Sequence, residues 1–437
     1  MAEEVLLAGR RPDRPLTFDE YRQQGGYGAL NLALRRKPEE LWKIVSDAGL
    51  RGRGGAGFPT GKKWSFIGPG FPRYVVPNTD EMEPGTFKDR VLVNVNPHLV
   101  LEGIILAGYA ISASKGIFFI RPSYEMDAEL IEREIQVARE AGFLGKNILG
   151  HDFSFDLVVH RSAGRYICGE ASAQVNAIMG RRAHPNKVVH MADTGLWGKP
   201  TIVNNVETLS CVPPILKNGP EWFRGLARSE KGAGTKLYCL SGRVVCPGCY
   251  ELPMGTPFGE ILEQAGGLPP GRELKAFLPG GASTSFMPKK FYEVPMDFDA
   301  LEATGNRLGT GAIIVFDQNT CLVGATLNLI EYFARESCGF CTPCREGLPY
   351  IRDLLWRIEI GEGKEEFIPL LRQMSNCMSL SYCAFAPGAA SPVLGLLNHF
   401  EDELREHLSQ KKCPFGGPGI DFRDSLIALE EPSRPTV

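Results

Sequence analysis

The stretch RGRGGAGFPTGKKW, residues 51–64, stands at the head of the region that decides the fold. Four glycines fall within six residues, so backbone N–H groups can approach an anion, and Arg53 and the two lysines add positive charge. The spacing fits neither a Walker A loop nor a GxGxxG turn. Phe58 and Trp64 offer faces for stacking on a planar ring. Taken alone, the stretch is equally typical of a flexible turn.

From this stretch onward, helical patterns alternate with short apolar runs, over residues 36 to about 225. The expected helices are Pro38–Ala48, His98–Ser112 and Glu125–Ala141, and the expected strands are Tyr74–Val76, Gly116–Ile120 and Phe155–Val159. Such alternation predicts an α/β fold, with helices layered on a sheet.

Two further changes of texture follow, and they suggest the domain order. A β-rich module is expected next, with strands at Leu237–Leu240, Val244–Val245 and Ala276–Leu278 and a short helix at Gly259–Gly266. A helical bundle is expected after it, broken at Gly361–Gly363 and Ala386–Ala389. The predicted divisions are an N-terminal arm (1–35), an α/β domain (36–234), the β-rich module (235–322), the helical domain (323–412) and an irregular tail (413–437).

Bulk properties exclude several function classes. The chain has 437 residues and a net charge of −3 with interspersed signs, which favours neither nucleic acid nor an anionic membrane surface. The acidic N-terminus is unlike a secretory signal. The most apolar helical run, Leu99–Ile111, contains Glu102 and is too short to span a bilayer. We expect no direct membrane insertion, and contact with a membrane only through a partner.

Cysteines provide the second strong signal. The segment Glu336–Gly347 reads ESCGFCTPCREG and spaces three cysteines as CxxCxxC. Three thiolates at this spacing suit one iron–sulfur cluster, which needs a fourth cysteine such as Cys377 or Cys383. Zinc is the alternative ligand, although zinc sites usually use two CxxC pairs. A separate pair, Cys246 and Cys249, is interpreted as a Pro-Gly turn between strands rather than as a redox pair.

Three polar stretches follow apolar strands. They read NTDEMEPGTFKDR (78–90), AGRYICGE (163–170) and KPTIVNNVET (199–208). Acidic and amide side chains at strand ends suit the hydroxyls of a ribityl chain and the polar edge of a flavin ring. Each stretch alone is also typical of helix N-caps and solvated turns.

Together these motifs resemble the 51-kDa-type flavoprotein subunit of respiratory complex I. The same family includes the diaphorase subunits of NAD-reducing hydrogenases and formate dehydrogenases. The similarity runs from about Tyr21 to Leu408. It implies a Rossmann-like flavin domain, a β-grasp (soluble-ligand-binding) module and a C-terminal helical bundle that carries an iron–sulfur cluster.

The resemblance also implies cofactors and the residues that bind them. FMN would be bound by Gly52, Arg53, Gly54, Lys63, Asn78, Asp80, Glu81, Tyr166, Gly169, Glu170, Asn204, Asn205 and Thr208. NADH would contact Phe58, Phe66, Glu83 and Lys187. One 4Fe–4S cluster would be bound by Cys338, Cys341, Cys344 and Cys383, which leaves Cys377 as a spare.

The implied activity is that of an NADH dehydrogenase module. A hydride passes from NADH to FMN, and single electrons then pass to the cluster, so no general base is required. The chain carries neither the thioredoxin-like nor the ferredoxin-like domain of many diaphorases, which favours the complex I form. The implied partners are a thioredoxin-like 2Fe–2S subunit and a multi-cluster large subunit. The implied location is the cytoplasmic side of the inner membrane, through the complex.

Departures from the family pattern gather on the nicotinamide side. Ala171 replaces a glutamate of the usual CGEETAL motif, and His190 stands where an aromatic residue stacks on adenine. Pro77 and Thr79 replace the usual cysteine and alanine around Asn78. These changes raise the alternative of a donor-switched subunit that keeps FMN and cluster but accepts electrons from a partner protein. Loss of the carboxylate at residue 171 also favours tolerance of NADPH.

Overall fold

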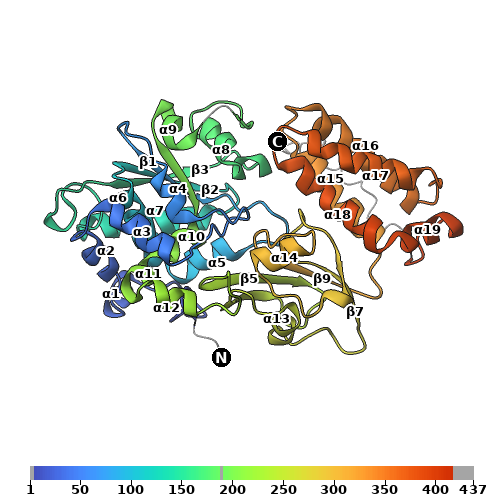
Figure 1. Ribbon diagram of the computed structural model, residues 1–437, viewed down its shortest axis with the longest axis horizontal. Coiled ribbons are helices and arrows are strands. Elements are labelled where there is room, and N and C mark those ends of the chain that lie inside the picture. Colours follow the sequence, from blue (N-terminus) through green and yellow to red (C-terminus); the bar gives the residue numbers. More distant parts are fainter. Residues whose placement is uncertain (1–3, 188–189, 417–437) are drawn as a thin grey trace, which may run out of the picture. The chain divides into compact units, whose positions relative to one another are not determined.

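The structure is a computed structural model that describes residues 4–187 and 190–416. The chain divides into two compact units, which are coloured along the sequence in Figure 1. The first unit comprises residues 1–317 with 336–340, and the second comprises 318–335 with 341–437. Each unit is described separately below.

A four-stranded parallel sheet forms the centre of the first unit. Its strands are β1 (Tyr74–Thr79), β2 (Lys115–Ile120), β3 (Asp156–Arg161) and β4 (Thr201–Asn205), in the order β3-β2-β1-β4. The chain runs outward from β1 to β3 and then returns to the opposite side of β1. In such sheets ligands bind at the carboxyl ends of the strands where the order reverses. The topology therefore directs attention to the carboxyl ends of β1 and β4.

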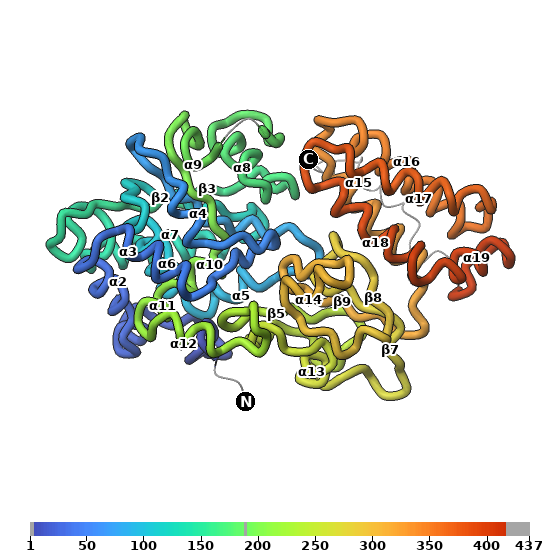
Figure 2. The backbone as a smooth tube through the Cα atoms, in the orientation of Figure 1, coloured from blue at the N-terminus to red at the C-terminus, as the bar shows by residue number. Residues whose placement is uncertain are grey.

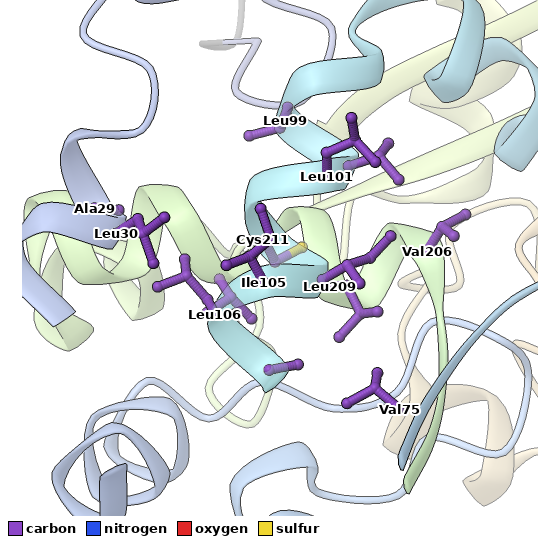
Figure 3. Packing of buried hydrophobic residues seen from close by; sticks show 14 of the residues in the cluster. Ala29, Leu30, Val75, Leu99, Leu101, Ile105, Leu106, Val206, Leu209 and Cys211 are labelled. Carbon is purple, nitrogen blue, oxygen red and sulfur yellow. The ribbon is translucent and has the colours of Figure 1, made fainter. Parts of the chain in front are cut away.

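Helix α6 (Pro97–Ala110) is buried on nearly every face, which explains why it is apolar all round. Figure 3 shows its leucines and isoleucines between residues of α2 (Gly28–Ala33), α10 (Val206–Ser210) and β1. The polar exception, Glu102, is only 1% exposed and accepts hydrogen bonds from the N–H groups of Tyr27 and Leu30 and from the hydroxyl of Tyr21. This carboxylate fastens the N-terminal arm into the core of the unit.

The other helices of this unit surround the same core, and Figure 2 shows α2 and α3 beside α11 and α12. Their bounds are α1 (Phe18–Gln23), α3 (Pro38–Asp47), α4 (Thr60–Ser65), α5 (Lys88–Val95), α7 (Glu125–Glu140), α8 (Ala171–Ile178), α9 (Met191–Thr194), α11 (Val212–Asn218), α12 (Pro220–Gly225), α13 (Phe258–Gln264) and α14 (Phe298–Ala303). The predicted α/β class with a parallel sheet is confirmed.

A second, mixed sheet builds the β-rich part of the same unit. Its strands are β5 (Thr235–Gly242), β6 (Gly248–Pro253), β7 (Leu274–Leu278), β8 (Met287–Pro288) and β9 (Ala312–Asp317), in the order β6-β5-β9-β7-β8. Only β5 and β9 pair in parallel. The predicted strand Val244–Val245 is wrong, because these residues lie in the turn between β5 and β6. That turn also carries Cys246, as the turn interpretation of the CPGC pair required.

The second unit is helical, as predicted. Its helices are α15 (Leu322–Glu336), α16 (Thr342–Glu359), α17 (Phe367–Cys377), α18 (Phe385–His399) and α19 (Glu401–Gln410). The predicted break at Ala386–Ala389 is wrong, because it lies inside α18. Pro387 is tolerated there since it occupies the first turn, where backbone N–H groups have no helical acceptor. Most of the predicted irregular tail, residues 417–437, lies outside the described residues.

None of the described helices is by itself long and apolar enough to cross a membrane. Helices α5 and α6 pass that test of length and composition only as a pair, and they are bent by 103° at the break between them.

Candidate functional site

The glycine-rich loop is closed at its base and open at its tip. An antiparallel bridge joins Arg51 to Pro59, just before α4 begins. Gly55 and Gly57 have φ values of 122° and 63°, which favour glycine. A Cβ on Gly57 would also lie 2.8 Å from the ring of Phe298. The loop conformation therefore depends on glycine at these two positions.

The tip of the loop presents unused donors. Among the described residues, the N–H groups of the segment 54–57 donate to no other group, and Gly54 and Ala56 are exposed. Lys63 lies half-buried nearby on α4 and donates to the carbonyl of Val203 at 2.9 Å. Burial lowers the pKa of Lys63. Free backbone donors beside an ammonium group suit a phosphate.

Arg53 behaves differently from its predicted role on the phosphate side. Its side chain is 1% exposed and donates to the carbonyl of Ala233 at 2.6 Å. Its backbone N–H donates to the hydroxyl of Thr208 at 2.8 Å, across 155 residues of sequence. Arg53 and Thr208 thus brace the loop against α10, and the guanidinium group is turned toward the β-rich module.

Two asparagines connect the loop to the strand ends. Asn204 accepts a hydrogen bond from the indole N–H of Trp64 at 3.0 Å. Asn205 lies in register with Asn78 on β1, donates to its carbonyl at 3.2 Å and to Asp89 at 2.6 Å, and caps α10. Gly54 passes so close that a Cβ there would lie 3.0 Å from the Cβ of Asn205. The structure thus brings together Gly54, Asn78, Asn204 and Asn205 at the switch point.

Two buried acids follow β1. Asp80 accepts a hydrogen bond from the hydroxyl of Ser162 at 2.6 Å, while its other oxygen, Oδ2, is buried with no partner among the described residues. Burial raises the pKa of Asp80 to about 6. Glu81 accepts from the N–H groups of Asp89 and Arg90, and burial raises its pKa to about 7. The free oxygen of Asp80 is an acceptor that a bound hydroxyl group can satisfy.

Sequence reasoning missed a buried charge network beneath this edge. Lys88 and Lys236 contact the carboxylate of Glu207 at 3.0 and 2.7 Å, and all three side chains are at most 1% exposed. Burial alone would raise the pKa of Glu207, but the two ammonium groups hold it below its ordinary value. Lys88 and Glu207 fall within the quoted polar stretches, whereas nothing in the sequence near Lys236 marks it.

Three more predicted residues are engaged in local contacts. Glu83 accepts from the N–H of Ser283 at 2.6 Å and from the hydroxyl of Tyr166, and burial raises the pKa of this carboxyl. Glu170 follows Gly169 and caps α8, accepting from the N–H of Ala173 at 2.8 Å. The structure thus pairs Glu83, predicted for NADH, with Tyr166, predicted for FMN.

Two aromatic rings flank the loop on its exposed side. Phe58 and Phe66 are 41% and 52% exposed, and their ring centroids are 6.3 Å apart. Lys187 is also exposed, and it immediately precedes residues outside the described part of the chain. No contact recorded in the described residues brings Lys187 to the two rings. Phe58 and Phe66 can stack on a planar heterocycle with little rearrangement.

The segment that carries Cys338 belongs to the first unit. The carbonyl of Cys338 accepts a hydrogen bond from Arg182 at 2.8 Å, and Glu336 accepts one from the N–H of Tyr166 at 2.9 Å. Phe340 stacks on His184, with ring centroids 5.0 Å apart. The first predicted cluster ligand is therefore attached to the loops that follow β3.

The remaining predicted cluster ligands lie in the second unit. Cys341 caps α16 and Cys344 is buried in its first turn, while Cys383 lies just before α18. Cys377 is exposed at the end of α17. A helix N-terminus favours negative charge, so the start of α16 suits thiolates bound to a cluster. All the described cysteines are free, which leaves these thiols available as ligands.

Comparisons with known proteins agree with this geometry. Family models match at residues 45–214 (Nuo51 FMN-binding domain), 237–286 (SLBB domain) and 324–407 (NADH-ubiquinone oxidoreductase-F iron-sulfur binding region). The chain is 45% identical to the second NADH-quinone oxidoreductase-F protein of Rhizobium meliloti, over 95% of this chain and 100% of the relative. It is 46% identical to the NADH-quinone oxidoreductase-F protein of Escherichia coli, over 92% of each chain.

A solved structure is similar over nearly the whole chain. It is an NAD+-reducing [NiFe]-hydrogenase in the H2-reduced state, matched with a TM-score of 0.80 and 33% sequence identity. The match covers 99% of this chain and 72% of the hydrogenase chain.

Proposed function

Since the chain belongs to the NADH-quinone oxidoreductase-F family, we propose that it is the electron-input subunit of a complex I-type enzyme. It oxidises NADH through FMN and passes electrons to a 4Fe–4S cluster. The observation that carries the proposal is the meeting, at one sheet edge, of four unused loop N–H groups, Lys63 and the unpartnered oxygen of Asp80. These groups match an anionic phosphate and a polyhydroxyl chain.

The residues of the chain bind and orient the cofactors. Gly54 and Lys63 would bind the phosphate, and Asp80 and Asn78 would face the ribityl chain or the ring. Tyr166, held by Glu83, would border the ring. When bound, FMN accepts an electron pair from NADH and releases electrons singly. Phe58 and Phe66 would hold the nicotinamide nucleotide by stacking.

The cluster ligands are the four cysteines that the family motif supplies, Cys338, Cys341, Cys344 and Cys383. The contacts of Arg182 and Glu336 support this function, because they attach the Cys338 segment to the loops of the flavin unit. The proposed partners are a thioredoxin-like 2Fe–2S subunit and a multi-cluster subunit. Through them the chain would lie peripherally, at the cytoplasmic side of the inner membrane.

Anaerobic stopped-flow absorbance tests the proposed donor. The flavin- and cluster-loaded protein is mixed with NADH, and bleaching of the visible flavin band is followed. Fast bleaching supports NADH oxidation. Protein that dithionite reduces but NADH does not would instead support the second candidate, a subunit that receives electrons from another protein, which the residues Ala171 and His190 favour. Quinone reduction by the assembled complex separates this role from that of a hydrogenase or formate dehydrogenase diaphorase.

A matched cysteine pair tests the proposed cluster ligands. Cys341→Ser is expected to abolish the electron paramagnetic resonance signal of the reduced cluster while flavin content stays unchanged. Cys377→Ser, in the same unit, is expected to keep the signal. Loss of the signal in the second variant alone would show that Cys377 is the ligand.

A further inference from the structure

A second group of metal-binding side chains lies in the second unit, apart from the CxxCxxC motif. Cys321 immediately precedes α15, Glu359 ends α16, His407 lies on α19 and Cys413 follows α19. Each residue offers one ligand atom, and the four atoms all lie within 4.8 Å of one another. Cys321 is partly buried and the other three side chains are buried. Four elements of the unit therefore converge on one point.

The distances among these atoms match a tetrahedral zinc site. Sγ of Cys321 lies 3.4 Å from Nε2 of His407 and 3.5 Å from Oε2 of Glu359, and Nε2 and Oε2 are 3.2 Å apart. Zinc binds sulfur at about 2.3 Å, and nitrogen or oxygen at about 2.0–2.1 Å. A tetrahedron with those bonds has edges of about 3.5 Å from sulfur to nitrogen or oxygen, and about 3.3 Å from nitrogen to oxygen.

The surrounding hydrogen bonds orient the group for binding a cation. Nδ1 of His407 lies 2.7 Å from the carbonyl oxygen of Glu403. A carbonyl only accepts, so Nδ1 carries a proton and the neutral ring presents a lone pair at Nε2. This arrangement is the usual one for a metal-ligating histidine. The N–H of Gly324 donates to Sγ of Cys321 at 3.2 Å, which favours a thiolate.

We propose that Cys321, Glu359, His407 and Cys413 form a structural Zn²⁺ site in the helical unit. Two thiolates with one imidazole favour zinc over the oxygen-binding ions Mg²⁺ and Ca²⁺. Four protein ligands leave no open coordination position, which is the pattern of a structural site rather than a catalytic one. The ion joins the start of α15 and the end of α16 to α19 and the segment after it. It is separate from the four cysteines proposed for the iron–sulfur cluster.

Metal analysis of the flavin- and cluster-loaded full chain, grown with zinc in the medium, tests the proposal. Mass spectrometry of the metals is expected to give about one zinc per chain beside the iron of the cluster. X-ray absorption at the zinc edge is expected to show two sulfur ligands at about 2.3 Å and two nitrogen or oxygen ligands at about 2.0 Å. Protein without zinc that binds none from added Zn²⁺ would overturn the proposal, as would zinc ringed only by nitrogen and oxygen. A further iron in place of zinc would also overturn it.

Three variants locate the ion. His407→Ala and Cys413→Ser are each expected to lower zinc content about tenfold, while iron and flavin contents stay constant. Cys377→Ser is the control, because it removes an exposed thiol of the same unit and should keep the full zinc content. Zinc retained in both site variants would overturn the assignment of these ligands. If the variants do not fold, the absorption spectrum of the unaltered protein still decides the question.

Discussion

The flavin edge and the nicotinamide face of the first unit are built in opposite ways. The flavin edge, formed by the carboxyl ends of β1 and β4, is buried and tied together by side chains far apart in sequence, such as Asn205 with Asp89. The nicotinamide face, represented by Phe58 and Phe66, is exposed and carries the departures from the family pattern. A buried polar network tolerates little change because each lost partner leaves a group unsatisfied. An exposed stacking surface tolerates substitution at a cost in affinity alone.

The largest expected effect comes from breaking the buried network under the flavin edge. Glu207→Ala leaves Lys88 and Lys236 buried without their shared carboxylate. Removing one member of a buried ion pair costs about 3–5 kcal/mol. The urea midpoint of the first unit, followed by the release of flavin fluorescence, should fall accordingly.

A surface ion pair supplies the control for this change. Glu125→Ala removes the partner of Arg161, where the two side chains are 54% and 35% exposed. Exposed pairs contribute about 0–1 kcal/mol. Equal midpoint shifts in the two variants would mean that the buried network adds nothing beyond a surface pair.

The next effect is a pH dependence that arises at Asp80. Burial raises its pKa to about 6 in the folded chain, compared with about 3.9 in an unfolded chain. Between these values the folded state binds more protons, so the stability of the flavin-free protein should fall as pH rises from about 4 to about 6. Up to about 3 kcal/mol is involved. Urea midpoints across this range measure it.

Two variants separate Asp80 from other titrating groups. Asp80→Asn should flatten the pH profile, because an amide does not titrate there. Ser162→Ala removes the hydroxyl that donates to Asp80, so the pKa should rise and the slope should extend to higher pH. A profile unchanged in both variants would exclude Asp80 as its source.

These contacts also show how far the sequence can be used for prediction. Residues close in sequence and strongly patterned are predicted well: the expected helix Glu125–Ala141 corresponds to α7, which covers Glu125–Glu140. The glycine loop and its neighbouring asparagines are also predicted as a group, and the structure brings Gly54 and Asn205 together.

Long-range pairings are not predictable from the sequence. The guanidinium of Arg53 bonds a carbonyl 180 residues away, and Cys321 meets His407 across 86 residues. No local periodicity encodes such pairs, because they depend on how separate elements pack. The false break at Ala386–Ala389 has a local cause instead, since a proline in the first turn of a helix looks the same in sequence as one in a loop.

On the nicotinamide face, smaller effects are expected, and they should appear in kinetics rather than in stability. Phe66→Ala and Phe58→Ala each remove an exposed ring, and a stacked base is worth about 1–3 kcal/mol. The KM for NADH should rise about tenfold to hundredfold with flavin content unchanged. Phe71→Ala, which removes another exposed ring, should leave KM unchanged. Loss of flavin from the first two variants would move these rings to the flavin edge.

The smallest effect concerns the choice between NADH and NADPH. Ala171 is the first residue of α8, so a carboxylate there is compatible with the helix N-terminus. Ala171→Glu should repel a 2′-phosphate by about 1 kcal/mol, which lowers the NADPH to NADH ratio of kcat/KM about fivefold to tenfold. Ala171→Gln has the same shape without the charge and should leave the ratio unchanged. If both variants lower the ratio equally, shape rather than charge at residue 171 sets the preference, and the nicotinamide face selects its donor by steric fit.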